Sequence, residues 1–233
     1  ICHSIFENDH IYSNILDSEL LEYAIVKSMN PMNLITRRSF QRHMNKNIVL
    51  ASLSCCEDIE IYSIFSNENV RDYLDAECVL KAIDRAHSVD IYRIMEYFQT
   101  HHGLSDAIVR CGIGKIFNNI HICKLLDSIE ISRDTFLQAI EKILNLNTII
   151  ELFSKYPQFV DIESVNMAIS NLRGHDICEL VKNDIVKSGL SSDNIRLAIL
   201  RCNAEEVKSI LNHELVVPFV DEEVKWLAST IFE

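Results

Sequence analysis

A small residue set in a constant apolar pattern recurs along this chain at intervals of 27 to 31 residues. The stretch SVNMAISNLRGHDICELV, residues 164–181, shows one copy: an apolar group around Ala168, a polar break, and a second apolar group. A period in this range indicates a stack of similar units, because one such unit cannot bury its apolar face alone. The small residues that mark the copies are Ala24, Ala51, Ala82, Cys111, Ala139, Ala168, Ala198 and Ala228.

Each marker lies in a pattern that predicts an amphipathic helix. Apolar residues stand three positions before it, usually one after it and often four after it, as in Val165, Ala168, Ile169 and Leu172. This spacing places them on one helix face. A small residue at the centre of that face allows a neighbouring helix to approach closely.

A second apolar group follows most markers after nine to eleven residues, as in Ile177, Leu180 and Val181, and it predicts a second helix. Ser132, Asp161, Ser191 and Asp221 precede first-helix patterns and suit helix N-caps. Five Gly and three Pro are few for 233 residues, which favours helices joined by short turns. We therefore expect an all-α solenoid of about eight helix–turn–helix units in one domain, 1–233, with terminal units as caps. The alternative is an irregular helical bundle.

The pattern resembles a degenerate ankyrin array over roughly residues 18–230. Phe136, Ala139 and Ile140 match the first ankyrin helix, and residues 174–181 (GHDICELV) match the turn and second helix. The Thr-Pro-Leu-His opening and the Gly-Ala-Asp-Val-Asn hairpin segment of that family are missing, and the period is shorter than the family's value of about 33. The resemblance implies an ankyrin-like solenoid with shortened or missing β-hairpin fingers. A generic α-solenoid is the second choice.

The same resemblance implies a non-catalytic scaffold that binds another protein. In ankyrin arrays the residues just after the small pair of the first helix line the concave surface. Carried over by position, the implied partner-binding residues are Asp84, Arg85, Glu141, Lys142, Ser170, Asn171, Leu200 and Arg201. Replacing Arg85, Lys142, Asn171 and Arg201 is then expected to weaken binding and leave folding intact. At the C-terminal end, Trp226 and Phe232, with Val216, Val217 and Phe219, are expected to close the last unit; the alternative is an apolar end that another chain covers.

The eight cysteines stand mostly where other units carry Ala, Ile or Leu, so we expect reduced thiols packed as small apolar side chains. The adjacent pairs Cys55-Cys56 and His101-His102 do not have the spacing of a zinc site. Motifs for a phosphate loop, a nucleophile elbow or a zinc protease are absent from the sequence. The sequence thus predicts no catalytic residue, metal or cofactor. The alternative function is an enzyme or enzyme accessory whose site combines dispersed residues such as His101, His102 and Cys111.

A formal net charge of −12 disfavours binding to nucleic acid. The basic run from Arg37 to Lys46 lacks interleaved aromatic residues and is read as a solvated face. No segment approaches eighteen uninterrupted apolar residues, and the first residues lack the order of a signal peptide, so we expect a cytoplasmic protein without membrane insertion.

The Ile- and Asn-rich composition resembles ankyrin proteins of intracellular pathogens and large DNA viruses, which act on host proteins; AT-rich coding produces the same bias. That resemblance implies a host-directed factor in the host cytoplasm or nucleus. The oligomeric state is left open.

Overall fold

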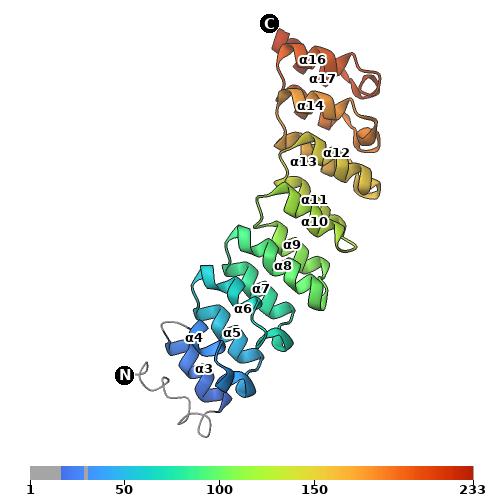
Figure 1. Cartoon of the computed structure of the whole chain (residues 1–233). Helices are drawn as coiled ribbons and strands as arrows, with labels where there is room; N and C mark the ends of the chain where they lie inside the picture. Colours follow the sequence, from blue (N-terminus) through green and yellow to red (C-terminus); the bar gives the residue numbers. More distant parts are fainter. Residues whose placement is uncertain (1–16, 29–30, 233) are drawn as a thin grey trace. The chain divides into compact units, whose positions relative to one another are not determined.

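The computed structural model describes residues 17–28 and 31–232, and within these ranges the regular structure consists of α-helices and short 3₁₀ helices, with no strand (Figure 1). The expected all-α class is confirmed. None of the described helices combines the length and the apolar character needed to cross a bilayer. The chain forms two compact units, residues 1–130 and 131–233, which we describe separately. The single domain expected from the sequence stays a prediction.

The first unit contains two rows of helices that alternate along the chain. In the row of first helices, α3 packs on α5, α5 on α7 and α7 on α9; in the row of second helices, α4 packs on α6 and α6 on α8. Their bounds are α3 Ser18–Lys27, α4 Met32–Ile35, α5 Lys46–Cys55, α6 Ile61–Phe65, α7 Ala76–Arg85, α8 Ser88–His102, α9 Asp106–Ile113 and α10 Asn119–Asp127. We call a first helix with the second helix that follows it a layer.

The second unit repeats this order. First helix α11 packs on α13, α13 on α15 and α15 on α17, while second helix α12 packs on α14 and α14 on α16. The bounds are α11 Arg133–Lys142, α12 Leu146–Lys155, α13 Ile162–Asn171, α14 Gly174–Val181, α15 Ser192–Ile199, α16 Ala204–Leu211 and α17 Glu222–Phe232. Because each helix contacts its counterpart in the next layer, apolar faces that a lone helix pair would expose become buried.

Every first helix begins at a side chain that caps it. An Asp, Asn or Ser oxygen accepts a hydrogen bond from the backbone N–H three residues later, which satisfies one of the four free N–H groups of a helix start. The capping residues are Asp17, Asn45, Asp75, Ser105, Ser132, Asp161, Ser191 and Asp221. They include all four caps expected from the sequence, and they set a common register for the eight first helices.

The caps correct the position of two markers. In six first helices the small marker residue is the seventh after the cap and is buried. In α5 and α9 the seventh residue is Ser52 or Gly112, both buried, and the expected markers Ala51 and Cys111 are only half-buried. A small residue is required there because the adjacent layer is close: a Cβ on Gly112 would lie 2.1 Å from Sδ of Met95 in α8.

The connectors from a second helix to the next first helix carry short 3₁₀ helices in five places. These are η1 Arg38–His43, η3 Arg71–Tyr73, η4 Pro157–Phe159, η5 Asp184–Gly189 and η6 Val217–Phe219. The described connectors contain no β-hairpin, so the segments that would project as fingers in an ankyrin array are short helical turns here. A further 3₁₀ turn, η2 Asp58–Glu60, leads into α6.

The expected closure of the last unit is only partly correct. Val216 is buried, but Trp226 is 69% exposed and Phe232 is 51% exposed. Trp226 is the fifth residue after its cap, and the equivalent residues Asn166 and Arg196 contact the layer that follows them. In α17, the last described helix, that position has no described layer to contact, so the indole faces solvent.

Candidate protein-binding surface

In each unit, the ninth residues after the caps form a row at the C-terminal ends of the first helices. Seven of the eight row residues are exposed and Gly114 is half-buried, although the seventh residue of the same helices is always buried. Each unit contributes four: Val26, Ser54, Asp84 and Gly114 in the first, and Glu141, Ser170, Leu200 and Thr230 in the second. The size, polarity and charge of these exposed side chains therefore vary from one first helix to the next, while the buried seventh residues of the same helices are always small. Four of the eight expected partner-binding residues lie in these rows.

The other four expected residues occupy the tenth position, and three of them hold adjacent layers together. Asn171 donates hydrogen bonds of 2.7 and 2.9 Å to the carbonyl oxygens of Ile140 and Glu141. Arg201 donates a bond of 3.1 Å to the carbonyl oxygen of Leu172. These carbonyls end the preceding first helix, where backbone acceptors lack partners within the helix. Lys142 is half-buried at the end of α11.

Arg85 forms the most extensive contact of this kind. Its guanidinium donates bonds of 2.8 Å to the Leu53 carbonyl and 2.7 Å to the Cys56 carbonyl, and it lies 3.4 Å from Oδ1 of Asp58. A cation at a helix C-terminus is also favoured by the helix dipole. We therefore expect replacement of Arg85, Asn171 or Arg201 to lower stability by removing contacts between layers, while the expectation that folding survives such replacements stays a prediction.

Asp84 in the exposed row is itself paired with the next layer. The Lys115 ammonium donates a bond of 3.0 Å to the Asp84 carboxylate and one of 2.7 Å to its carbonyl. The bond from Lys115 holds the pKa of Asp84 below its ordinary value. Lys115 also occupies a tenth position. Hydrogen bonds from a tenth-position side chain to the end of the preceding first helix therefore occur in both units.

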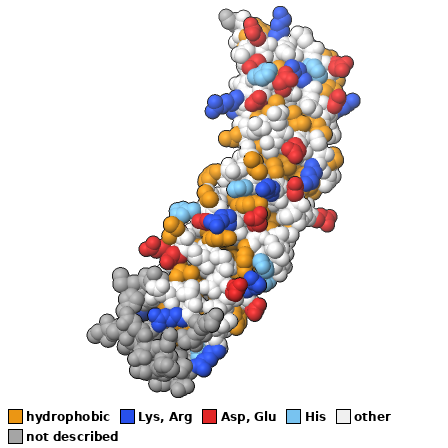
Figure 2. All heavy atoms as spheres, in the orientation of Figure 1, with side chains coloured by type: hydrophobic (Ala, Val, Ile, Leu, Met, Phe, Trp, Pro, Cys, Tyr) orange, Lys and Arg blue, Asp and Glu red, His pale blue; other side chains and the backbone are white. Residues whose placement is uncertain are grey.

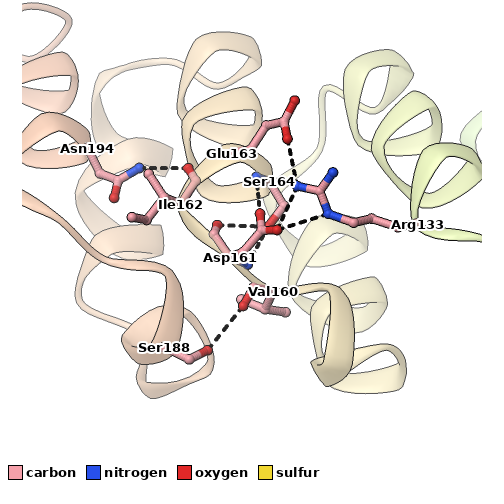
Figure 3. Close-up of polar contacts among 8 residues, drawn as sticks. All are labelled: Arg133, Val160, Asp161, Ile162, Glu163, Ser164, Ser188 and Asn194. Carbon is pink, nitrogen blue, oxygen red and sulfur yellow. Dashed lines mark hydrogen bonds and ion pairs between the residues drawn. The ribbon is translucent and has the colours of Figure 1, made fainter.

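At the opposite end of the first helices, a basic side chain bridges two carboxylates of the next layer in three places. Arg133 lies 2.6 Å from both Asp161 and Glu163. Figure 3 shows its guanidinium directed at both carboxylates. Lys46 bridges Asp75 and Glu77 in the first unit, and Arg196 bridges Asp221 and Glu223 in the second. In each bridge one carboxylate is the cap of its helix. We call these three groups the cap bridges.

A buried amide and an exposed hydroxyl continue this layer-to-layer bonding. Asn194 is fully buried, and its amide donates to the Ile162 carbonyl at 3.1 Å and to Oδ1 of Asn166 at 2.7 Å. Ser188 of η5 donates to the Val160 carbonyl at 3.3 Å (Figure 3). Because the two hydrogen bonds from Asn194 satisfy its buried amide, they hold α15 against α13 in one arrangement.

The cap bridges predict a loss of stability in acid. Burial tends to raise the pKa of Asp75, but hydrogen bonds from Lys46 and from the Cys78 amide have the larger effect, so the pKa of Asp75 is lowered. Hydrogen bonds from the Val224 amide and from Arg196 lower the pKa of Asp221 to about 2. A carboxylate with a lowered folded-state pKa stabilises the fold above its unfolded pKa of about 3.9 and loses that effect as the pH falls toward the folded value. We expect the melting temperature to decrease between pH of about 4 and 2, and to decrease less in Asp221→Asn, which keeps a capping oxygen. An equal decrease in both proteins, measured by circular dichroism, would contradict this.

Cys55, Cys56, Cys78, Cys111, Cys178 and Cys202 are free thiols, and three of these are poor nucleophiles. Burial raises the pKa of Cys56 and Cys202 to about 12 and that of Cys78 to about 11, so these thiols stay protonated at neutral pH. Cys2 lies outside the described residues. Cys111 is half-buried on α9.

The two histidines of the alternative enzyme hypothesis lie exposed at the end of α8. The His101 ring stacks on Tyr97 and the His102 ring on Phe98, with the two imidazole centroids 6.4 Å apart. Among the described residues, no three His, Cys, Asp or Glu side chains are grouped so that they could hold a metal ion. The stacking contacts with Tyr97 and Phe98 account for the positions of the two imidazole rings.

Acidic, basic and hydrophobic side chains are interspersed on the face drawn in Figure 2. Such a mixture is ordinary for a protein surface and does not by itself mark an interface. Comparison with known proteins identified no relative: no family model, curated protein or solved structure matches this chain.

Proposed function

We propose that this chain is a non-catalytic, ankyrin-like helical solenoid that binds another protein through its exposed ninth-position residues, of which each unit presents its own row. The observation that carries the proposal is the contrast within each first helix between a buried, size-restricted seventh residue and an exposed, chemically variable ninth residue. Repeat proteins use such rigid, extended surfaces for recognition. A host-directed role in a host cell is part of this proposal and rests on the compositional resemblance alone.

The test is an affinity capture from host-cell lysate with mass spectrometry, using the native chain and a row variant. The variant replaces Asp84, Glu141, Ser170 and Leu200 by alanine. These side chains are exposed, and the one ion pair lost, Asp84 with Lys115, is a solvent-exposed pair of a kind that contributes little to stability. We expect a protein that the native chain retains and the row variant loses.

Two controls separate binding from folding. Alanine at Glu151, Ser154 and Lys208, exposed on second helices, should leave capture unchanged. Asn171→Ala should cost about 1 kcal/mol of stability through its lost hydrogen bonds and still bind while folded. Equal capture by the native chain and the row variant would refute the proposed surface, and no specific capture by either would refute the function.

A further inference from the structure

Two cysteines of the second unit lie at the same junction between layers. Cys178 is buried on α14, and Cys202 is half-buried in the turn before α16. The Cys202 thiol donates a hydrogen bond of 3.4 Å to the carbonyl oxygen of Gly174, and the Cys178 thiol donates one of 3.9 Å to the carbonyl oxygen of Glu206. Each thiol therefore contacts the backbone of the segment that carries the other thiol.

The position of the Gly174 carbonyl shows how close the two cysteines are. Gly174 stands four residues before Cys178 in α14, so its carbonyl oxygen accepts the backbone N–H of Cys178 at about 2.9 Å. The Cys202 sulfur, 3.4 Å from the same oxygen, therefore lies at most about 6.3 Å from the Cys178 nitrogen. The pKa of Cys202 is raised first by burial, but Glu206 and the Cys178 thiol also raise it, which agrees with this short separation.

The packing of layers does not require a thiol at either position. Cys202 is the eleventh residue after its cap, and Cys178 directly follows the buried isoleucine that leads its second helix. One layer earlier in the same unit, the equivalent positions carry Ile150 and Leu172. Because an aliphatic pair serves the same packing, the two sulfur atoms are available for a chemical role.

We propose that Cys178 and Cys202 form a reversible disulfide under oxidising conditions, and that this bond locks the layer of α13 and α14 to the layer of α15 and α16. In the reaction both S–H bonds break and one S–S bond forms. The two hydrogen atoms and their electrons pass to hydrogen peroxide, whose O–O bond breaks to give two water molecules. A dithiol such as dithiothreitol reverses the step by returning two hydrogen atoms to the sulfurs and becoming a disulfide itself.

The exposure and protonation of Cys202 set the expected rate of the reaction. Cys202 is half-buried, so a small oxidant can approach it. Its pKa of about 12 keeps the thiol protonated at neutral pH, and the thiolate is the reactive form. We therefore expect the disulfide to form over minutes to hours at neutral pH and to form faster as the pH is raised.

The disulfide is expected to stabilise the second unit. A bond between residues of neighbouring layers restricts the unfolded chain, and natural cross-links of this loop length raise stability measurably. We expect the melting temperature of the oxidised chain to be higher by about 5–10 °C.

The test is oxidation of the reduced full chain with hydrogen peroxide, blocking of the remaining thiols, and tryptic digestion without reductant. Trypsin cleaves after Arg173, Lys182, Arg201 and Lys208, so the disulfide joins peptides 174–182 and 202–208, each of which contains one cysteine. We expect this linked pair, identified by mass spectrometry, together with the rise in melting temperature. Dithiothreitol should reverse both effects.

Three variants separate this disulfide from oxidation elsewhere. Cys178→Ala and Cys202→Ala should each abolish the linked peptides and the rise in melting temperature. Cys55→Ala is the matched control, since Cys55 is exposed on α5 of the first unit, and it should behave like the native chain. The row variant should also oxidise like the native chain, because this inference uses no residue of the partner-binding rows.

Three results would overturn the proposal. One is the absence of linked peptides 174–182 and 202–208 after prolonged oxidation of the native chain. Another is the linkage of either peptide to a different cysteine in place of this pair. The third is an unchanged melting temperature in protein that contains the disulfide.

Discussion

Replacing Phe136 by alanine is expected to lower the free energy of unfolding by about 3–5 kcal/mol, the usual cost of removing a buried aromatic ring. Phe136 is fully buried on α11. Its ring centre lies 5.9 Å from that of Phe153, 6.0 Å from Tyr156 and 5.5 Å from Phe159. The change would therefore remove the ring through which α11 contacts α12 and η4.

Urea denaturation of the full chain, followed by circular dichroism, measures this effect. Phe136→Leu is the matched control, because leucine fills part of the volume and should cost clearly less. A loss below about 1 kcal/mol for the alanine variant would show that the site collapses around the cavity and that the ring cluster contributes little.

Gly189→Ala is expected to destabilise the protein by about 1–3 kcal/mol, as overpacking in a tight interior does. Gly189 ends η5 and is buried. An added Cβ would lie 2.6 Å from the carbonyl oxygen of Asp161 and 2.8 Å from Cγ2 of Val165. Asp161 is the cap of α13 and a member of a cap bridge. The backbone of Asp161 would have to move to make room for the added Cβ, but the capping interactions of Asp161 hold that backbone in place.

Gly174→Ala is the control for this prediction. Its Cβ would lie 2.6 Å from Oε2 of Glu206, which also accepts a 2.9 Å hydrogen bond from the Asn203 N–H in the capping box of α16. Because a side chain can shift more easily than the backbone of Asp161, and alanine also restricts the unfolded chain, a smaller loss than for Gly189→Ala is expected. Similar melting temperatures for Gly189→Ala and the native chain would show that α13 tolerates the shift.

Part of the surface assignment could be made from the sequence. The small residues indicated the first helices, and counting forward from them reached the exposed positions of Asp84, Glu141, Ser170 and Leu200. The adjacent residues Arg85, Asn171 and Arg201 looked equally accessible, because their acceptors are carbonyls in a helix about thirty residues earlier. Only the packed layers bring those groups together.

The proximity of Cys178 and Cys202 was missed for a related reason. Each cysteine was read within its own helix pattern, where it looks like one more small apolar residue. The sequence does not show that Cys178 contacts α16 or that Cys202 contacts the start of α14, because those contacts form between layers.

By itself, the sequence determined that the chain is helical and where its first helices lie, because helical periodicity and capping act within a few residues. Two markers, Ala51 and Cys111, were placed one residue too early in the sequence, because small residues stand side by side at both sites. Only the distance from the capping residue shows which of them is buried. The tertiary structure alone decided which polar residues join layers and which face solvent, since those roles depend on groups one layer away in space and about thirty residues away in the chain.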